Sequence, residues 1–336
     1  HSPILPAANQ SVIVSAYVTD VHQISSMLLN YRLDPATNFT SVGMSYNGAG
    51  FYSGIIHGQA AGRLAAFHLQ ATDIGGAKST FPNDAPAREC LVFFGETQPS
   101  GRIGTYRIWL TQRTINTWVA RERGSNEELD ATFVYGNERV VYNMGADYSG
   151  SPFHWGNYDS PVGRNCNYVM VFPDDDLFLG VTDFVLNAPS NLGNDNTAIR
   201  EQTFYWMANE LGQPTTYRRF HYLFVNGLRR GSSTSGFIFE DAQQPNREFI
   251  EEWFPNDADG DFYKIEDWFE FNDAASSFRN VDATLENFTT TGGVKKLARY
   301  RWMFRKRSVQ DSANNYTNLF ALVDAVNTPP ALGPDA

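Results

Sequence analysis

The acidic run Asn256–Asp261 carries the side chains that most resemble a metal site. It reads N-D-A-D-G-D, and carboxylate oxygens are the ligands that Ca²⁺ prefers. A calcium-binding EF-hand loop, however, needs glycine at its sixth position and a bidentate glutamate at its twelfth. Here Gly260 directly follows the second aspartate, and no glutamate stands at the required spacing. We therefore interpret this run as a solvated acidic turn.

Other common catalytic arrangements are missing from the sequence. The internal histidines are dispersed without metal-ligand spacing, and the G-x-S-x-G element of serine hydrolases does not occur. His68 and His221 lie in apolar segments typical of strands, so we expect both to be packed side chains.

Cys90 and Cys166 are the only cysteines, which excludes a multi-cysteine zinc site. They form a disulfide candidate, but two buried thiols are equally compatible with the sequence, because a bridge requires the two residues to be close in space.

The charge balance limits the classes of partner. Lys and Arg total 26 against 37 Asp and Glu, a net charge of -11, which opposes binding to nucleic acid or anionic lipid. No apolar run approaches the roughly 20 residues that span a bilayer. We therefore expect no nucleic acid and no membrane span, and a protein partner or self-association instead.

Sequons and composition favour an exported chain. The mixture of aromatic residues with Asn, Gly and Thr is typical of exported β-rich proteins, and we expect an extracellular or cell-surface location. Four N-x-S/T sequons are glycosylation candidates: Asn9, Asn38, Asn287 and Asn315.

A basic, aromatic segment follows an acidic one near the C-terminus. Nine carboxylates and one cation, Lys264, lie between Glu251 and Asp273, whereas Lys and Arg cluster in residues 295–307. The basic segment could bind RNA or an acidic partner. We favour mutual packing of the two segments, because the whole chain is acidic.

The N-terminal part predicts antiparallel strands. Apolar residues alternate with polar ones over residues 11–95, with Gly and Asn breaks between the segments. Asn47-Gly48 between aromatic flanks predicts a hairpin, since both residues accept positive φ. We expect residues 1–98 to form an immunoglobulin- or fibronectin-like β-sandwich.

Residues 99–336 predict an α+β domain, with its boundary inside the Pro/Gly-rich linker 98–101. Strands come first, with a hairpin around Gly136-Asn137. A helix follows over 197–211, where Phe204, Met207, Ala208 and Leu211 share one face; Asn196 or Thr197 would cap its start. A second helix is predicted at 313–326.

Several segments of this second region resemble CotH-type spore-coat kinases. They are D-A-T-F-V-Y, Y-N-M-G-A, T-A-I-R-E-Q, L-F-V-N-G, F-E-D-A-Q and G-D-F-Y-K, in the family's order and within residues 105–330. The resemblance implies a nucleotide-binding lobe that uses ATP and Mg²⁺. It places four candidate nucleotide-binding residues: Arg164, Arg200, Glu201 and Glu240.

The chain also departs from that family. Asp147 stands where the family has basic residues, and the family's lysine-containing strand aligns with Arg164–Tyr168. An aspartate facing phosphates would repel them. The family's downstream acidic motifs have no counterpart before Ala336, so we expect an incomplete CotH kinase-like domain without catalytic residues or metal ligands of its own.

Three functions follow as expectations. The first is an exported structural or binding protein, with an immunoglobulin-like domain and an inactive CotH-like domain, that serves as a subunit of a cell-surface or extracellular fibrous assembly. The second is a fragment of an active CotH-like kinase that transfers phosphate from ATP to Ser. The third is a carbohydrate-binding module, by analogy with other sandwich domains.

Overall fold

The computed structural model describes residues 1–121, 125, 127–149, 160–162, 166–188, 197, 199–231, 238–265, 268–269, 279–280, 283–308 and 312–328. The chain divides into two compact units, His1–Gln243 and Gln244–Ala336. Strands outnumber helices, so the expected class, mainly β with α+β, is confirmed. The expected boundary between residues 98 and 99 lies inside the first unit and stays a prediction.

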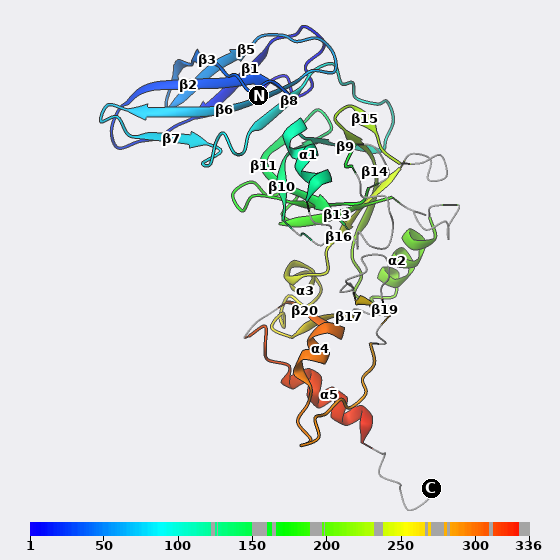
Figure 1. The fold of residues 1–336 in the computed structure, drawn as a ribbon. Coiled ribbons are helices and arrows are strands. Elements are labelled where there is room, and N and C mark those ends of the chain that lie inside the picture. Colours follow the sequence, from blue (N-terminus) through cyan, green and yellow to red (C-terminus); the bar gives the residue numbers. More distant parts are fainter. Residues whose placement is uncertain are drawn as a thin grey trace, which may run out of the picture. The chain divides into compact units, whose positions relative to one another are not determined.

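Two antiparallel sheets form the N-terminal part of the first unit (Figure 1). The strands of one sheet are, in spatial order, β1 (Val12–Tyr17), β5 (Phe51–Ile56) and β4 (Ser45–Gly48). Those of the other are β3 (Thr40–Gly43), β2 (Ile24–Leu33), β6 (Leu64–Asp73) and β7 (Lys78–Phe81), with β8 (Cys90–Phe93) also paired to β6. Val12, Leu29, Ile56 and Phe67 lie in their common core. The immunoglobulin-like topology of this sandwich stays a prediction.

The hairpin predicted at Asn47-Gly48 is confirmed. Strands β4 and β5 pair across it, and Gly48, Ala49 and Gly50 all have positive φ. Gly48 and Gly50 adopt positive φ without steric cost, because glycine has no Cβ.

The second part of the first unit is a closed β-barrel. An eight-stranded sheet runs in the order β15-β14-β16-β13-β12-β11-β10-β9. Because β14 also pairs with β9, the seven strands from β14 to β9 form a closed ring. Strand β15 is outside this ring and pairs with β14 alone. Their bounds are β9 Gly104–Trp109, β10 Leu129–Tyr135, β11 Arg139–Tyr148, β12 Tyr168–Val171, β13 Asp183–Asn187, β14 Arg218–Val225, β15 Leu228–Arg229 and β16 Phe239–Gln243.

Alternation along each strand fills the barrel. Tyr106 and Ile108 of β9 point into the barrel core with Phe133, Met170 and Phe184, since successive side chains in a strand face opposite sides. Trp109 instead packs outside the barrel, against Leu91 and Phe93 of the sandwich. The hairpin predicted at Gly136-Asn137 joins β10 to β11 and is confirmed.

Helix α1 (Gln112–Ala120) follows β9 directly. Thr111 caps it, because the Thr111 hydroxyl accepts a hydrogen bond from the backbone N–H of Thr114 (3.1 Å). Trp118 from this helix enters the barrel core.

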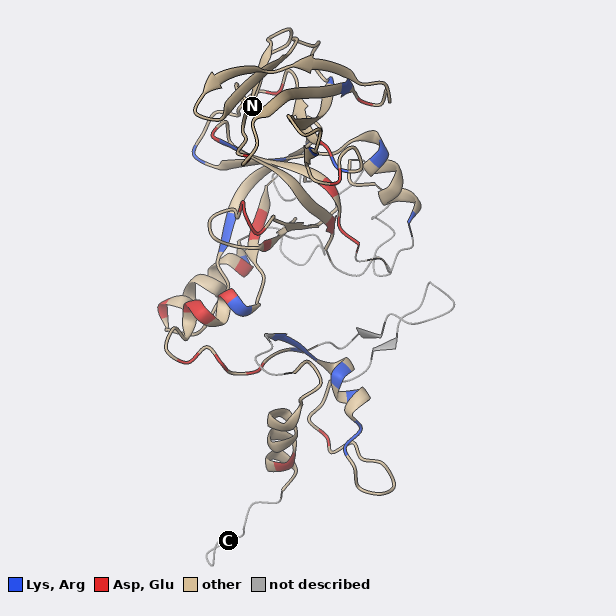
Figure 2. Ribbon diagram, turned by 90° about the vertical axis from the view of Figure 1, so that its left-hand side faces the viewer, with Lys and Arg blue, Asp and Glu red and all other residues tan. Residues whose placement is uncertain are grey.

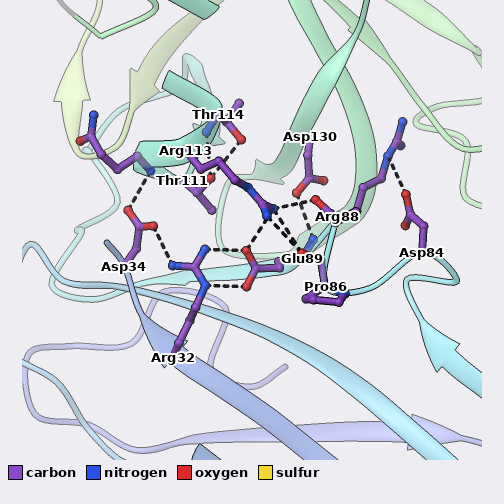
Figure 3. Close-up of polar contacts among 12 residues, drawn as sticks. Arg32, Asp34, Asp84, Pro86, Arg88, Glu89, Thr111, Arg113, Thr114 and Asp130 are labelled. Carbon is purple, nitrogen blue, oxygen red and sulfur yellow. Dashed lines mark hydrogen bonds and ion pairs between the residues drawn. The ribbon is translucent and has the colours of Figure 1, made fainter. Parts of the chain in front are cut away.

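A buried polar cluster joins sandwich and barrel (Figure 3). Glu89 is 1% exposed and accepts hydrogen bonds from Arg32 at Oε1 (2.7 Å) and at Oε2 (2.5 Å). Arg113 of α1 approaches Glu89 Oε2 at 3.4 Å. The Glu89 backbone N–H donates to Asp130 of β10 (3.0 Å). Both parts of the first unit therefore depend on this one carboxylate.

The second unit combines short strands and helices around its own core. Strand β17 (Phe262–Ile265) pairs with β20 (Phe304–Ser308), and β18 (Trp268–Phe269) pairs with β19 (Arg279–Asn280). The helices are α3 (Arg247–Trp253), α4 (Leu297–Met303) and α5 (Thr317–Asn327). Tyr300, Met303, Leu319 and Val323 form the core. Helix α5 confirms the helix predicted at 313–326, with its start four residues later.

The predicted contact between acidic and basic segments occurs inside this second unit. Strand β20, coloured as a basic stretch in Figure 2, pairs with β17 of the acidic segment. Lys306 Nζ lies 2.6 Å from Asp261 Oδ1, and both side chains are largely buried. Asp261 therefore neutralises the buried Lys306 side chain. For this residue, the interpretation of the run Asn256–Asp261 as a solvated turn was wrong.

The helix predicted at 197–211 exists as α2 (Arg200–Glu210), but its predicted apolar face is not packed. Phe204, Met207 and Leu211 are 67%, 52% and 74% exposed. The predicted caps were wrong as well: the helix begins after Ile199 without a side-chain cap, and Asn196 lies outside the described residues. In the described part of the chain, no helix is long and apolar enough to cross a membrane.

We predict that Glu89→Gln destabilises the first unit by about 3 kcal/mol, because it leaves the buried Arg32 guanidinium without its main counter-charge. Urea denaturation measures the loss. The control is Asp84→Asn, which removes the half-exposed ion pair with Arg88 and should cost less than about 1 kcal/mol. Equal losses in the two variants would contradict the role assigned to Glu89.

Asp130 gives a pH prediction. Burial raises the pKa of Asp130 to about 7, only partly offset by the N–H of Glu89 and by Arg88. The folded chain therefore holds a proton that the unfolded chain has released, and stability should fall as pH rises from about 4 to 7, by at most about 1.4 kcal/mol per pH unit.

Asp130→Asn should remove this part of the pH dependence, since the amide stays neutral and its oxygen still accepts from the Glu89 N–H. Urea midpoints at pH 5 and pH 8, compared between the wild-type chain and the variant, measure the difference. Parallel pH curves for the two proteins would show that Asp130 ionises normally.

Candidate functional site

Two carboxylates and one arginine connect helix α2 to the outside of the barrel. Arg218 of β14 lies 2.8 Å from Glu201 Oε1 of α2 through Nη2, and 3.1 Å from Glu240 Oε2 of β16 through Nη1. The Arg218 guanidinium also lies over the Tyr205 ring, 4.3 Å from its centroid. One cation thus bridges two acids on separate elements.

The two acids of this bridge differ in environment. Glu240 is 1% exposed, whereas the Glu201 side chain is 56% exposed. Burial raises the pKa of Glu240, and Arg218 partly offsets this by stabilising the ionised form. The buried carboxylate consequently depends on Arg218 for its charge balance.

A second ion pair occupies the opposite face of the same strands. Asp241 is fully buried, lies 2.5 Å from Arg219 Nη2, and accepts a hydrogen bond from the Tyr106 hydroxyl (2.7 Å). Burial raises the pKa of Asp241, and Arg219 and Tyr106 counteract it. Because neighbouring strand residues point to opposite faces, Glu240 and Asp241 cannot ligate one metal ion together.

His221 adds no acid–base group to this face. Its ring stacks on Tyr106 (4.3 Å between centroids), and burial lowers its pKa to about 3. The imidazole is therefore neutral at physiological pH, and the expectation of a packed histidine is confirmed.

The four candidate nucleotide-binding residues do not lie together in one described site. Arg164 lies outside the described residues. Arg200 is the exposed first residue of α2. Glu201 and Glu240 are brought together by Arg218, which the sequence analysis missed; the R-R-F-H segment before L-F-V-N-G was the available signal. The assignment of these residues to nucleotide stays a prediction.

Asp147, expected to face phosphates, is instead buried at the end of β11 and paired with Arg121. Arg121, directly after helix α1, packs over the rings of Trp118 and Tyr148. Burial raises the pKa of Asp147 and Arg121 opposes the shift. Asp147 is therefore neutralised within the barrel.

The two cysteines are free, buried thiols, so the disulfide alternative is not realised. Cys90 belongs to the core of the sandwich and Cys166 to the core of the barrel. Burial raises the pKa of both thiols. Cys166 is therefore an uncharged thiol at neutral pH.

All four sequon asparagines, Asn9, Asn38, Asn287 and Asn315, are exposed, as glycan attachment requires. Their glycosylation stays a prediction.

Comparison with known proteins gives one family model and several remote solved structures. The family model described as CotH kinase protein matches residues 169–332. No curated protein matches significantly. A solved structure of the cycloalternan-degrading enzyme from Trueperella pyogenes is similar at 11% identity and a TM-score of 0.21, over 71% of this chain and 29% of that one.

The same enzyme in complex with a covalent intermediate gives 12% identity and a TM-score of 0.23, over 71% of this chain and 32% of the other. This chain therefore spans about a third of the length of those proteins. The family match crosses from the first compact unit into the second, since it includes strands β12 to β16 as well as helices α3 to α5. Over residues 169–332, just under half of its length, this chain is thus similar to the CotH kinase protein family.

Proposed function

We propose that this chain is an exported structural or binding protein in which the CotH kinase segment serves as a scaffold rather than as a phosphotransferase. The observation that carries the proposal is the double pairing of Arg218 with Glu201 and Glu240. A guanidinium already held by two carboxylates has little attraction left for a phosphate.

The local charge supports the same proposal. The charged side chains of α2, β14 and β16 are three arginines and four carboxylates, so they sum to one negative charge: Arg200, Arg218, Arg219, Glu201, Glu210, Glu240 and Asp241. Asp147 and Cys166 bring no positive charge to the neighbouring strands. The described residues around α2, β14 and β16 therefore do not fit the phosphates of ATP.

Magnesium fits these residues no better. A Mg²⁺ ion in a kinase is held by carboxylates that converge on it and by the nucleotide phosphates. Glu240 and Asp241 point to opposite faces of one strand, and each is occupied by an arginine. The described residues of these strands therefore do not fit a Mg²⁺ ion.

One observation favours the second candidate, an active CotH-like kinase. The ion pair between Glu201 on a helix and Arg218 on a strand resembles the helix-glutamate and strand-cation pair of protein kinases. In this candidate, Arg218 would leave Glu240 and contact the phosphates of ATP.

Calorimetric titration with ATP and Mg²⁺ distinguishes the two candidates. We predict no binding up to about 1 mM nucleotide, which corresponds to less than about 4 kcal/mol of binding free energy. A Kd for ATP below about 100 μM in the wild-type chain, with binding lost in Arg218→Gln, would overturn the scaffold proposal and favour the kinase. Lys78→Gln, on strand β7 of the sandwich, serves as the charge-matched control.

A protein partner is part of the proposal, with a second copy of this chain as its first candidate. Phe204, Met207 and Leu211 form an exposed apolar face on α2, and apolar faces of this kind are common in protein interfaces. The exposed sequon asparagines and the net charge of -11 support an extracellular setting for such an assembly.

We predict that Phe204→Gln combined with Met207→Gln weakens self-association roughly tenfold or more. Sedimentation velocity over a range of protein concentrations measures it. Ile74→Gln, at an equally exposed apolar residue of the sandwich, should leave association unchanged. A wild-type chain that stays monomeric at every concentration would contradict self-association, without bearing on nucleotide binding.

A further inference from the structure

Three metal-ligating side chains converge at one end of the sandwich, away from the ion pairs described above. They are Asp20 and His22, in the connection between β1 and β2, and Asp73, the last residue of β6. One ligand atom from each lies within 4.8 Å of the other two. No other group of this kind occurs among the residues that the structure describes.

Asp73 is the fixed member of this group. Its side chain is 9% exposed, and Oδ1 accepts a hydrogen bond from the backbone N–H of Ala77 (2.7 Å) across the turn into β7. The second oxygen, Oδ2, has no hydrogen-bond donor among the described residues. It points to His22 Nδ1 at 3.8 Å, beyond hydrogen-bonding distance. This oxygen is not among the fully buried side-chain atoms, so it is open to a further ligand beside the His22 ring.

Asp20 and His22 are the adjustable members. His22 Nδ1 lies 3.5 Å from Asp20 Oδ1, and the two side chains are 65% and 36% exposed, respectively. The backbone of their loop is anchored beside Asp73, because the N–H of Ile74 donates to the Gln23 carbonyl (2.9 Å). Asp20 Oδ1 accepts a hydrogen bond from the His22 backbone N–H (2.7 Å), so Asp20 Oδ1 is held beside the imidazole, and rotation of the exposed His22 ring can close the group without moving a strand.

The distances suit a small cation. Ligand atoms about 2.0–2.1 Å from a tetrahedral Zn²⁺ ion are about 3.3 Å apart, and the two measured distances from His22 Nδ1 are 3.5 and 3.8 Å. One imidazole nitrogen with two carboxylate oxygens is a donor set that Zn²⁺ accepts and that Ca²⁺, which prefers oxygen alone, does not.

From this geometry we propose that Asp20, His22 and Asp73 form a zinc site, with water in the fourth position. The ion would bind Asp73 Oδ2 and balance the charge of the two carboxylates. It also cross-links the β1–β2 connection to the turn between β6 and β7. The site is a stabilising clamp for the sandwich, and it is independent of the proposed function of the CotH kinase segment.

Calorimetric titration of the full chain with ZnCl₂, after removal of metals by chelation, tests the site. We expect one Zn²⁺ ion bound with micromolar or tighter affinity, weakened at least tenfold by His22→Gln and by Asp73→Asn. His57→Gln, at an exposed histidine outside the group, should bind as the wild-type chain does. Asparagine at position 73 can still accept from the Ala77 N–H, so the turn is retained.

Thermal unfolding gives a second measurement. Saturating Zn²⁺ should raise the Tm of the wild-type chain and of His57→Gln by about 3 °C or more, and should leave the Tm of His22→Gln unchanged. Zinc affinity that is the same in all variants, absent binding, or tighter binding of Ca²⁺ than of Zn²⁺ would each overturn the proposal.

Discussion

The carboxylate of Glu89 is the interaction on which the first unit depends. A charged group that is 1% exposed is costly unless it is fully paired, and Glu89 meets this requirement with arginines from two different parts of the chain. Arg32 comes from the C-terminal end of β2 and Arg113 from the helix after the first barrel strand. The arrangement that brings α1 and β10 beside the sandwich is therefore also the one that completes this cluster.

The same solution recurs elsewhere in the barrel. Glu240, Asp241 and Asp147 are all buried acids, and each is matched by an arginine from a neighbouring element. Burial shifts the pKa of each upward, and the arginine partly offsets the shift. The barrel is thereby rich in cations that are already paired with the protein's own carboxylates.

Local signals in the sequence predicted the strands well and their partners poorly. Asn47-Gly48 and Gly136-Asn137 fix two hairpins because positive φ is a property of those residues themselves. The parallel pairing of β9 with β14 joins Gly104–Ile108 to His221–Val225 and has no local signature. The spacing of Phe204, Met207 and Leu211 correctly predicted that α2 is a helix. Such spacing does not show whether other residues pack on the apolar face of the helix, and here the three side chains are exposed.

The site was predictable only in part, for the same reason. Glu201 and Glu240 were predicted from the family resemblance, but Arg218 was not. Its role arises because it contacts both of these acids, which are 39 positions apart in the sequence. His22 was dismissed for lack of spacing to other ligands, yet Asp73 reaches it from the far end of another strand. Pairings across sheets are decided by topology, which one sequence does not display.

Closure of the barrel has a consequence for how this chain can be divided. The family match begins at Val169, inside β12, whereas β9, β10 and β11 lie before it and contribute three of the seven strands of the ring. A fragment that starts at residue 169 would leave β12 and β14 with unpaired N–H and C=O groups along their edges. Such open edges recruit strands from other molecules and promote aggregation. The smallest soluble piece of this fold therefore begins well upstream of its recognisable family segment.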